Sequence, residues 1–352
     1  MVFPEKFLAF LAITICGLGA LAHPGDSIEL INREAAPHKA ALRTAHASMA
    51  KCENHPEALR LKEDAIARRS AYVKAVARRN DSPHVKKDMD ALKKWEAISH
   101  DHTGVLDWDA STPESTIFGS NATTALSPES ILGPYFVSGE LFRKDITEGQ
   151  KGVPLHLDIQ FVNQNNCTAI KDMLVDVWQS NATGVYSGIA QGAGQASLNT
   201  TFLRGVAKTD AQGVVQFDTV FPGHYGGRAN HVHILTTEGY TLLPNDTYTG
   251  GSASHLGQLY FDQALNDEVE KQDPYNTNKQ QYLTNQEDGF AKDAASNLYD
   301  PFMSYVRLGQ GPADGILAYI TVGIDQGAHH DASPAARWGS DGGRECHNGQ
   351  CN

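Results

Sequence analysis

Two histidines of this chain, His231 and His233, stand two positions apart in a segment rich in β-forming residues. Because successive side chains of a β-strand point to opposite faces, both imidazoles would lie on the same side of a sheet. Two imidazoles on one face make a pair of metal ligands that suits zinc, copper, iron or nickel. Taken alone, the pair favours two ordinary strand histidines over a metal site.

Two tyrosines and an arginine strengthen the metal interpretation. A turn just before the histidines contains Tyr225 and Arg228, and it is marked by Pro222, Gly223, Gly226 and Gly227. Farther upstream, a predicted strand over Leu174–Trp178 leads into a polar loop that ends at Tyr186. The sequence therefore offers four ligand-type side chains in two separate motifs.

The two motifs together resemble those of a known enzyme family. They read Asp-Val-Trp-Gln-x-Asn-Ala-x-Gly-x-Tyr-Ser over 176–187 and Pro-Gly-x-Tyr-x-x-Arg-x-x-His-x-His over 222–233. This pairing resembles the intradiol ring-cleavage dioxygenases, and more narrowly their secreted fungal members. The resemblance extends from about residue 132 to residue 325. It implies a non-haem Fe(III) held by Tyr186, Tyr225, His231 and His233.

The resemblance also implies the reaction. Enzymes of this family split a catechol between its two hydroxyl carbons, taking both atoms of O2 and forming a muconate-type diacid. Tyr225 would leave the metal and accept a catechol proton, Arg228 would stabilise negative charge on the ring, and Gln258 would hydrogen-bond to the oxygens of the intermediates. For Arg228, an ion pair that supports the turn is the structural alternative.

The donor types agree with ferric iron. Phenolate is a hard anionic donor that favours Fe(III), and two phenolates with two neutral imidazoles nearly balance its charge. A 2-His-1-carboxylate Fe(II) site needs an Asp or Glu near the histidines, and this segment offers Tyr and Arg instead. Two other hypotheses stay open: a secreted β-sandwich module that binds carbohydrate or a wall polymer, and a zinc site with a structural role only.

Composition limits the partners and the compartment. The chain has 352 residues, a net charge of −12 and a pI near 5.6. An acidic chain argues against nucleic acid or an anionic membrane as a partner. Residues 1–22 read as a secretory signal, with an apolar run over 7–21 and Ala20-Leu21-Ala22 before the cleavage point. No second apolar run follows, so we expect a secreted protein without a membrane span, and the oligomeric state stays open.

Cysteines and glycosylation motifs agree with secretion. Beyond the signal segment four cysteines remain, and four cysteines allow three pairings that sequence alone does not resolve. We expect Cys346 to pair with Cys351 across a short loop, which leaves Cys52 for Cys167. Asn-x-Ser/Thr motifs predict a glycoprotein, and one of them lies five residues before Tyr186. They stand at Asn80, Asn121, Asn166, Asn181, Asn199 and Asn245.

The fold that must position these residues is predicted to be mainly β, an antiparallel β-sandwich preceded by an N-terminal helical region. Residues 23–130 would form that helical region and a linker, with basic pairs such as Arg68-Arg69 on a solvated helix face. Residues 131–325 would form the sandwich. Within it, 153–161 alternates apolar and polar side chains as a half-buried strand does. Residues 326–352 lack periodicity and are predicted to be a flexible tail.

Overall fold

The computed structural model describes residues 48–49, 51–52, 54–76, 91–96, 98–103, 133–190, 195–245, 247–295, 300–347 and 350–351. The signal segment and most of the linker lie outside these residues, and so do the motifs at Asn80 and Asn121. None of the described helices is long and apolar enough to cross a membrane.

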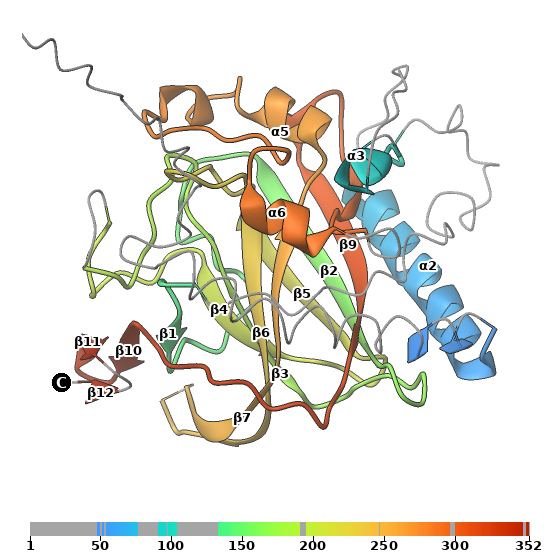
Figure 1. Ribbon diagram of the computed structural model, residues 1–352, viewed down its shortest axis with the longest axis horizontal. Helices are drawn as coiled ribbons and strands as arrows, with labels where there is room; N and C mark the ends of the chain where they lie inside the picture. The colour runs from blue at the N-terminus through green and yellow to red at the C-terminus, as the bar shows by residue number, and fades with distance from the viewer. Residues whose placement is uncertain are drawn as a thin grey trace, which may run out of the picture.

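Two four-stranded sheets pack face to face, as predicted for a β-sandwich (Figure 1). The first has the order β5-β2-β9-β8, and the second has the order β4-β3-β6-β7. All neighbours are antiparallel except β2 and β9, which run parallel. The bounds are β2 Pro154–Asn163, β3 Leu174–Trp178, β4 Arg204–Lys208, β5 Val214–Val220, β6 His231–Leu242, β7 Tyr248–Tyr260, β8 Ser304–Arg307 and β9 Ile316–Ile324.

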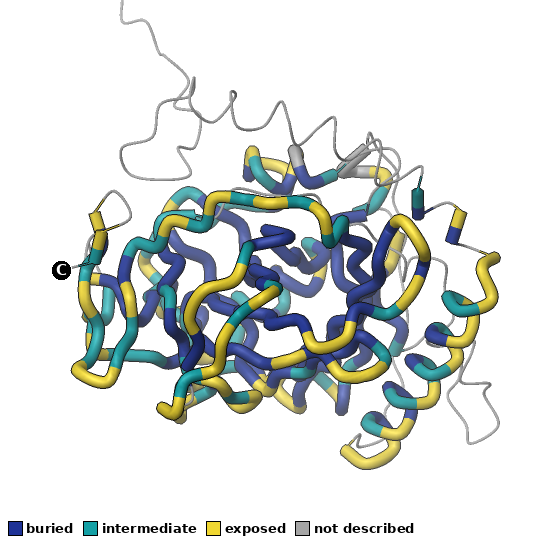
Figure 2. The backbone as a smooth tube through the Cα atoms, turned by 90° about the horizontal axis from the view of Figure 1, so that it is seen from below, coloured by how far each residue is buried: buried dark blue, intermediate teal, exposed yellow. Residues whose placement is uncertain are grey.

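The main core lies between the two sheets. Leu157 and Phe217 of the first sheet share one buried cluster with Val177 and Ile234 of the second, and each is at most 1% exposed. Figure 2 shows that the buried backbone segments gather in the middle of the molecule. Burying the apolar faces of both sheets against each other is the main stabilising contribution in such a sandwich.

Helices surround the sheets at the edges and at one end. They are α2 Pro56–Val76, α3 Ala91–Glu96, α5 Gln263–Val269 and α6 Gly289–Ala294, with 3₁₀ turns at Tyr275–Thr277 and Pro312–Asp314. The helix α2 covers the outer side of the first sheet, and Val73 packs against Val306 and Leu317 there. Its inner side is buried and its outer side is exposed (Figure 2).

This helix corrects two predictions. The strand β2 is buried on both faces rather than on one, because α2 covers its polar side. The Arg68-Arg69 pair is not on a solvated face: both guanidinium groups donate hydrogen bonds to Asp158, whose carboxylate is buried in the middle of β2. Arg69 itself is only 1% exposed. The pair attaches the helix to the sheet.

The C-terminal segment is the third correction. In place of a tail without regular structure, it forms the strands β10 Ala336–Gly339, β11 Gly342–His347 and β12 Gln350–Cys351. They build a small sheet with β1 Val137–Ser138, which pairs in parallel with β10. The strands are too short to show a period in the sequence, and they are held by pairing with one another and, through β10, with β1.

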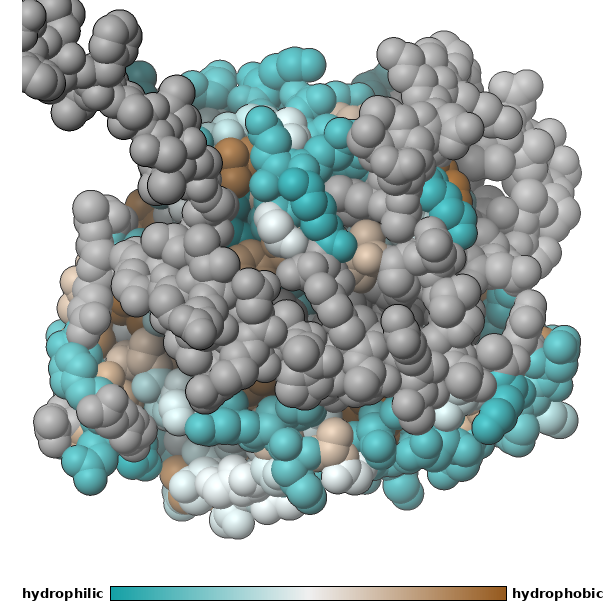
Figure 3. Space-filling view, in the orientation of Figure 1, coloured by the Kyte–Doolittle hydropathy of each residue, from teal (hydrophilic) through white to brown (hydrophobic). Residues whose placement is uncertain are grey.

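Both expected disulfides are confirmed. Cys346 bonds to Cys351 across the β11–β12 turn, and Cys52 bonds to Cys167 across 115 positions of sequence. The second bond joins the segment before α2 to the loop after β2. The described surface on the face seen in Figure 3 is mostly hydrophilic, with apolar patches of small extent.

Candidate metal centre

The four predicted ligand residues lie together in the structure. Tyr186 comes from the loop after β3, Tyr225 from the turn before β6, and His231 and His233 from the first residues of β6. The ring centroids of Tyr186 and Tyr225 are 5.3 Å apart, those of Tyr225 and His231 5.5 Å, and those of Tyr186 and His233 6.3 Å. All four side chains are buried.

The pairing of strand β6 fixes the two imidazoles on one face. His231 pairs with Tyr260 of β7, and His233 lies between Trp178 of β3 and Gln258 of β7. The Trp178 ring stacks on the His233 ring at 4.8 Å and 7°. This stacking restrains the imidazole, so its orientation depends on a side chain from the neighbouring strand.

The loops that carry the tyrosines are tied to each other by Gln280. Its amide nitrogen donates to the carbonyl oxygens of Thr183 and Gly184, at 3.0 and 2.8 Å, and its amide oxygen accepts from the Gly226 N–H at 2.9 Å. At Gly184 the backbone has φ +76°, and an added Cβ would lie 2.3 Å from Gln280 and from the His224 carbonyl oxygen. Glycine is therefore required where the two loops meet.

The histidines show the arrangement of metal ligands. The His231 Nδ1 atom lies 2.7 Å from the Ala229 carbonyl oxygen, so Nδ1 carries the proton and Nε2 keeps its lone pair. The Nε2 atoms of His231 and His233 are 3.0 Å apart. Two ring nitrogens at that distance need a proton or a cation between them, because two lone pairs repel each other. The Tyr186 hydroxyl, also buried, makes no hydrogen bond of normal geometry with the described residues.

Burial sets the protonation of the cluster. It raises the pKa of Tyr186 well above the usual phenol value, and it raises the pKa of Tyr225 against the opposing effect of Arg228. Burial, with the nearby positive charge of Arg228, lowers the pKa of His231 to about 3. In the metal-free protein at neutral pH, both phenols are therefore protonated and His231 is neutral.

The donor set fits Fe(III). Two phenol oxygens and two imidazole nitrogens become, after loss of the phenol protons, the hard anionic and neutral donors that ferric iron prefers. Within the described part of the chain, no group of three or more His, Cys, Asp or Glu side chains could hold a metal ion. The described residues thus offer neither a thiolate zinc site nor a 2-His-1-carboxylate set.

Arg228 and Gln258 both border the tyrosine–histidine cluster. One guanidinium nitrogen of Arg228, Nη1, donates to the Tyr225 hydroxyl at 3.2 Å, and Nε donates to Asp288 at 2.9 Å. The Gln258 amide oxygen accepts from Arg228 and from the Tyr260 hydroxyl. Its amide nitrogen is buried without a partner among the described residues. Arg228 thus combines the ion pair and the site contact that the sequence left as alternatives.

A third tyrosine, Tyr135, lies against the same cluster. Its ring centroid is 4.7 Å from that of Tyr186 and 5.8 Å from that of Tyr225. Burial raises its pKa to about 12. Tyr135 belongs to the segment that leads into β1, so the small C-terminal sheet supports this wall of the site.

Sequence reasoning missed Asp288, Gln280 and Tyr260 as parts of this site. Asp288 and Gln280 lie in a loop-rich segment with no motif that marks them. Tyr260 follows Gln258 in the Gln-Leu-Tyr-Phe run, and that spacing places both side chains on the same face of β7.

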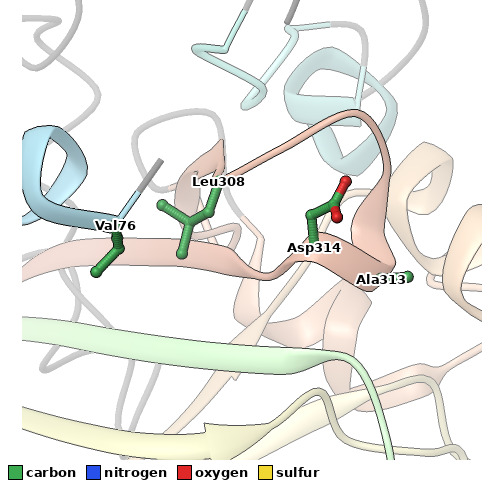
Figure 4. A pocket seen from close by; sticks show the side chains of 4 residues that line it. All are labelled: Val76, Leu308, Ala313 and Asp314. Carbon is green, nitrogen blue, oxygen red and sulfur yellow. The ribbon is translucent and has the colours of Figure 1, made fainter. Parts of the chain in front are cut away.

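A separate hollow lies elsewhere on the surface. It has a volume of about 290 Å³ and is bordered by Val76, Leu308, Ala313 and Asp314, at the end of α2 (Figure 4). It shares no residue with the tyrosine–histidine cluster. Its lining of two aliphatic side chains, an alanine and one carboxylate offers no set of catalytic groups.

Comparison with known proteins identifies the sandwich. The family described as "Dioxygenase" matches residues 131–287. An intradiol ring-cleavage dioxygenase from Tetranychus urticae is 26% identical, with 61% of this chain and all of that chain covered and a TM-score of 0.49. A second dioxygenase structure has the same identity and coverage and a TM-score of 0.50.

Some more distant structures are matched over a smaller share of their length. Catechol 1,2-dioxygenase from Pseudomonas arvilla C-1 is 19% identical, with 56% of this chain and 62% of that chain covered and a TM-score of 0.37. No curated protein sequence matches the chain. Residues 131–287 therefore match the dioxygenase family, and the sandwich is similar to that of a solved dioxygenase.

Proposed function

We propose that this protein is a secreted non-haem Fe(III) dioxygenase that cleaves small catechol-type diols with O2 to muconate-type diacids. The observation that carries the proposal is the convergence of two buried phenols and two buried imidazoles, with two Nε2 atoms 3.0 Å apart. Tyr186, Tyr225, His231 and His233 would hold the iron. When bound, ferric iron would draw electron density from a coordinated catechol and prepare its ring for O2.

The side chains around the ligands would handle protons and charge. A catechol must lose two protons to bind as a dianion. The Tyr225 oxygen, as phenolate, can accept one of these protons, and it has a donor 3.2 Å away in Arg228. The Arg228 guanidinium supplies a fixed positive charge beside the dianion.

Three further side chains would shape the site. The unpartnered amide nitrogen of Gln258 is available to donate to an oxygen of the reacting substrate. The rings of Tyr135 and Trp178 surround the ligands with apolar surface, which excludes water and strengthens electrostatic interactions within the site.

The compartment and the glycans are part of the same proposal. Two disulfides are typical of proteins from oxidising compartments. The side chains of Asn166, Asn199 and Asn245 are exposed, which makes them suitable acceptors. Asn181 is instead half-buried, and its amide nitrogen, the atom to which a glycan would be attached, donates to the Gln150 side chain. We therefore expect Asn181 to carry no glycan.

The proposal is tested by colour and by activity. Iron-loaded protein should show the visible charge-transfer band of ferric tyrosinate and should consume O2 with catechol, hydroxyquinol or protocatechuate. His231→Ala should lose iron, and Tyr225→Phe should keep some iron but lose most activity. Tyr240→Phe changes a tyrosine farther along the same strand and is the matched control. Full iron content and activity in His231→Ala would refute the ligand assignment.

The same measurements separate the other hypotheses. A structural zinc site would hold zinc in preference to iron and give a colourless protein. A binding module would retain carbohydrate or wall polymer without consuming O2.

A further inference from the structure

Asp288 is a fully buried carboxylate that faces two directions. One oxygen, Oδ2, accepts from Arg228 Nε and from the Ala229 N–H, each at 2.9 Å. The other oxygen, Oδ1, accepts from the N–H groups of Phe290 and Ala291, at 2.8 and 3.3 Å, and caps helix α6. The side chain is 0% exposed. One carboxylate thus joins the start of α6 to the arginine of the proposed site.

These contacts fix the orientation of Arg228. Asp288 holds the Nε edge of the guanidinium, and the Phe290 ring lies under its face at 4.6 Å. The opposite edge then faces the site, where Nη1 donates to Tyr225 and Nη2 donates to Tyr260 and Gln258. With Nε bound to Asp288, a rotation of the guanidinium would break contacts on both edges.

The negative charge of Asp288, as well as its hydrogen bonds, keeps the Arg228 guanidinium in the buried site. Arg228 is only 1% exposed, and a buried cation without a counter-charge is strongly unfavourable. Among the described residues, Asp288 is the carboxylate that forms an ion pair with it. Without that charge, we expect the guanidinium to turn toward water and to leave the Tyr225 oxygen.

We propose that Asp288 is a positioning residue for the ring-cleavage reaction. It holds the charged edge of Arg228 against the Tyr225 oxygen, and this contact would stabilise the phenolate that accepts a catechol proton. The inference rests on the proposed function, and it extends that function to a residue one position beyond the region that matches the family.

Helix capping alone is the competing explanation, and one substitution separates the two. Asparagine caps helices as well as aspartate does, so Asp288→Asn keeps the cap and the size but removes the charge. Asp288→Ala removes both. Asp262→Asn is the matched control, because Asp262 is also buried and caps α5 through Leu265 but does not touch Arg228.

The experiment uses the full iron-loaded chain and catechol as the substrate. For Asp288→Asn we expect iron content and melting temperature close to those of Asp262→Asn. We also expect a shifted ferric-tyrosinate band and a kcat lowered roughly 10- to 100-fold, the range for a misplaced catalytic group. KM should change much less. If Asp288→Asn matches the control in band and kcat, while Asp288→Ala alone is impaired, Asp288 is only a cap and the proposal is overturned.

A readout without iron keeps this test separate from the proposed function. In the metal-free protein, the Arg228 Nε–H should give a slowly exchanging NMR signal that disappears in Asp288→Asn and persists in Asp262→Asn. If the wild type shows no iron band but this signal behaves as expected, the proposed function fails while the positioning of Arg228 by Asp288 stands. A signal unchanged in Asp288→Asn refutes the positioning.

Discussion

Iron binding should release phenol protons, and their number can be worked out from the structure. Burial raises the pKa of Tyr186 and of Tyr225, so both phenols hold their protons at neutral pH. The pKa of His231 is lowered to about 3, so this imidazole has no proton to lose above pH 5. Binding to both oxygens must therefore displace two phenol protons. Each displaced proton makes the apparent affinity rise about 10-fold per pH unit between pH 6 and 8.

The assay compares slopes, because iron and its chelator also exchange protons with water. Iron is supplied as its nitrilotriacetate chelate, and the fraction bound is read from the ferric-tyrosinate band as a function of pH. The slope of log affinity against pH should fall by about one unit in Tyr186→Phe and by about one unit in Tyr225→Phe. It should not change in Tyr135→Phe. That variant loses a phenol with a pKa of about 12 beside the same rings, and it is the matched control.

One result would refute the reasoning directly. If the Tyr225→Phe slope equals that of the wild type, the Tyr225 oxygen is not bound as phenolate. If Tyr135→Phe lowers the slope instead, the ligands have been assigned to the wrong tyrosine.

Three further predictions concern stability. Asp158→Asn should lower the free energy of unfolding by about 3–5 kcal/mol, because it leaves the buried Arg69 without its counter-charge. The Arg68–Arg69 pair holds the pKa of Asp158 below its usual value, so this stabilisation is present above about pH 4 and is lost as the pH falls. Urea titrations at pH 7 and pH 3 measure the free energy of unfolding, and its difference between the two pH values should be smaller in Asp158→Asn than in the wild type. Cys52→Ser should cost up to about 4.8 kcal/mol, the chain-entropy value for a closed loop of 115 residues. Chemical denaturation in the presence and absence of reductant measures this cost. A wild type equally stable with and without reductant would contradict that prediction. Burial raises the pKa of Glu140 to about 7, so its contribution to stability is lost as the pH rises through 7. Glu140→Gln should therefore show a flatter dependence of the melting temperature on pH between 5 and 8.

The proximity of the four candidate ligands could be predicted because they lie in two short motifs that resemble those of a known family. A strand with histidines two apart places both rings on one face, and the glycine-rich turn before it brings Tyr225 close. Short-range patterns also predicted the sandwich, from strand segments separated by turns, and the disulfides, from the short spacing of Cys346 and Cys351. Gln258 was placed only through the family resemblance, since nothing in its own segment shows that β7 pairs with β6.

What the sequence did not predict depends on contacts between distant segments. Asp288 is 60 positions from Arg228, and nothing around it marks a partner. Arg68 and Arg69 looked solvated because a basic pair on a helix usually is, and their partner Asp158 lies about 90 positions away on a strand. The C-terminal strands gave no periodicity because they are short and are held by pairing with one another and, through β10, with β1.

The parallel pairing of β2 with β9 determines how far the chain can be truncated from its C-terminus. The region that matches the family stops at residue 287, but β9 pairs with β2 along nine residues from Leu155 to Asn163. A recombinant fragment ending at 287 would lack β8 and β9 and would leave β2 as an open edge with unpaired backbone groups, a surface prone to aggregation. A recombinant fragment should therefore extend at least through Ile324, and keeping Cys52 would retain the cross-link to Cys167.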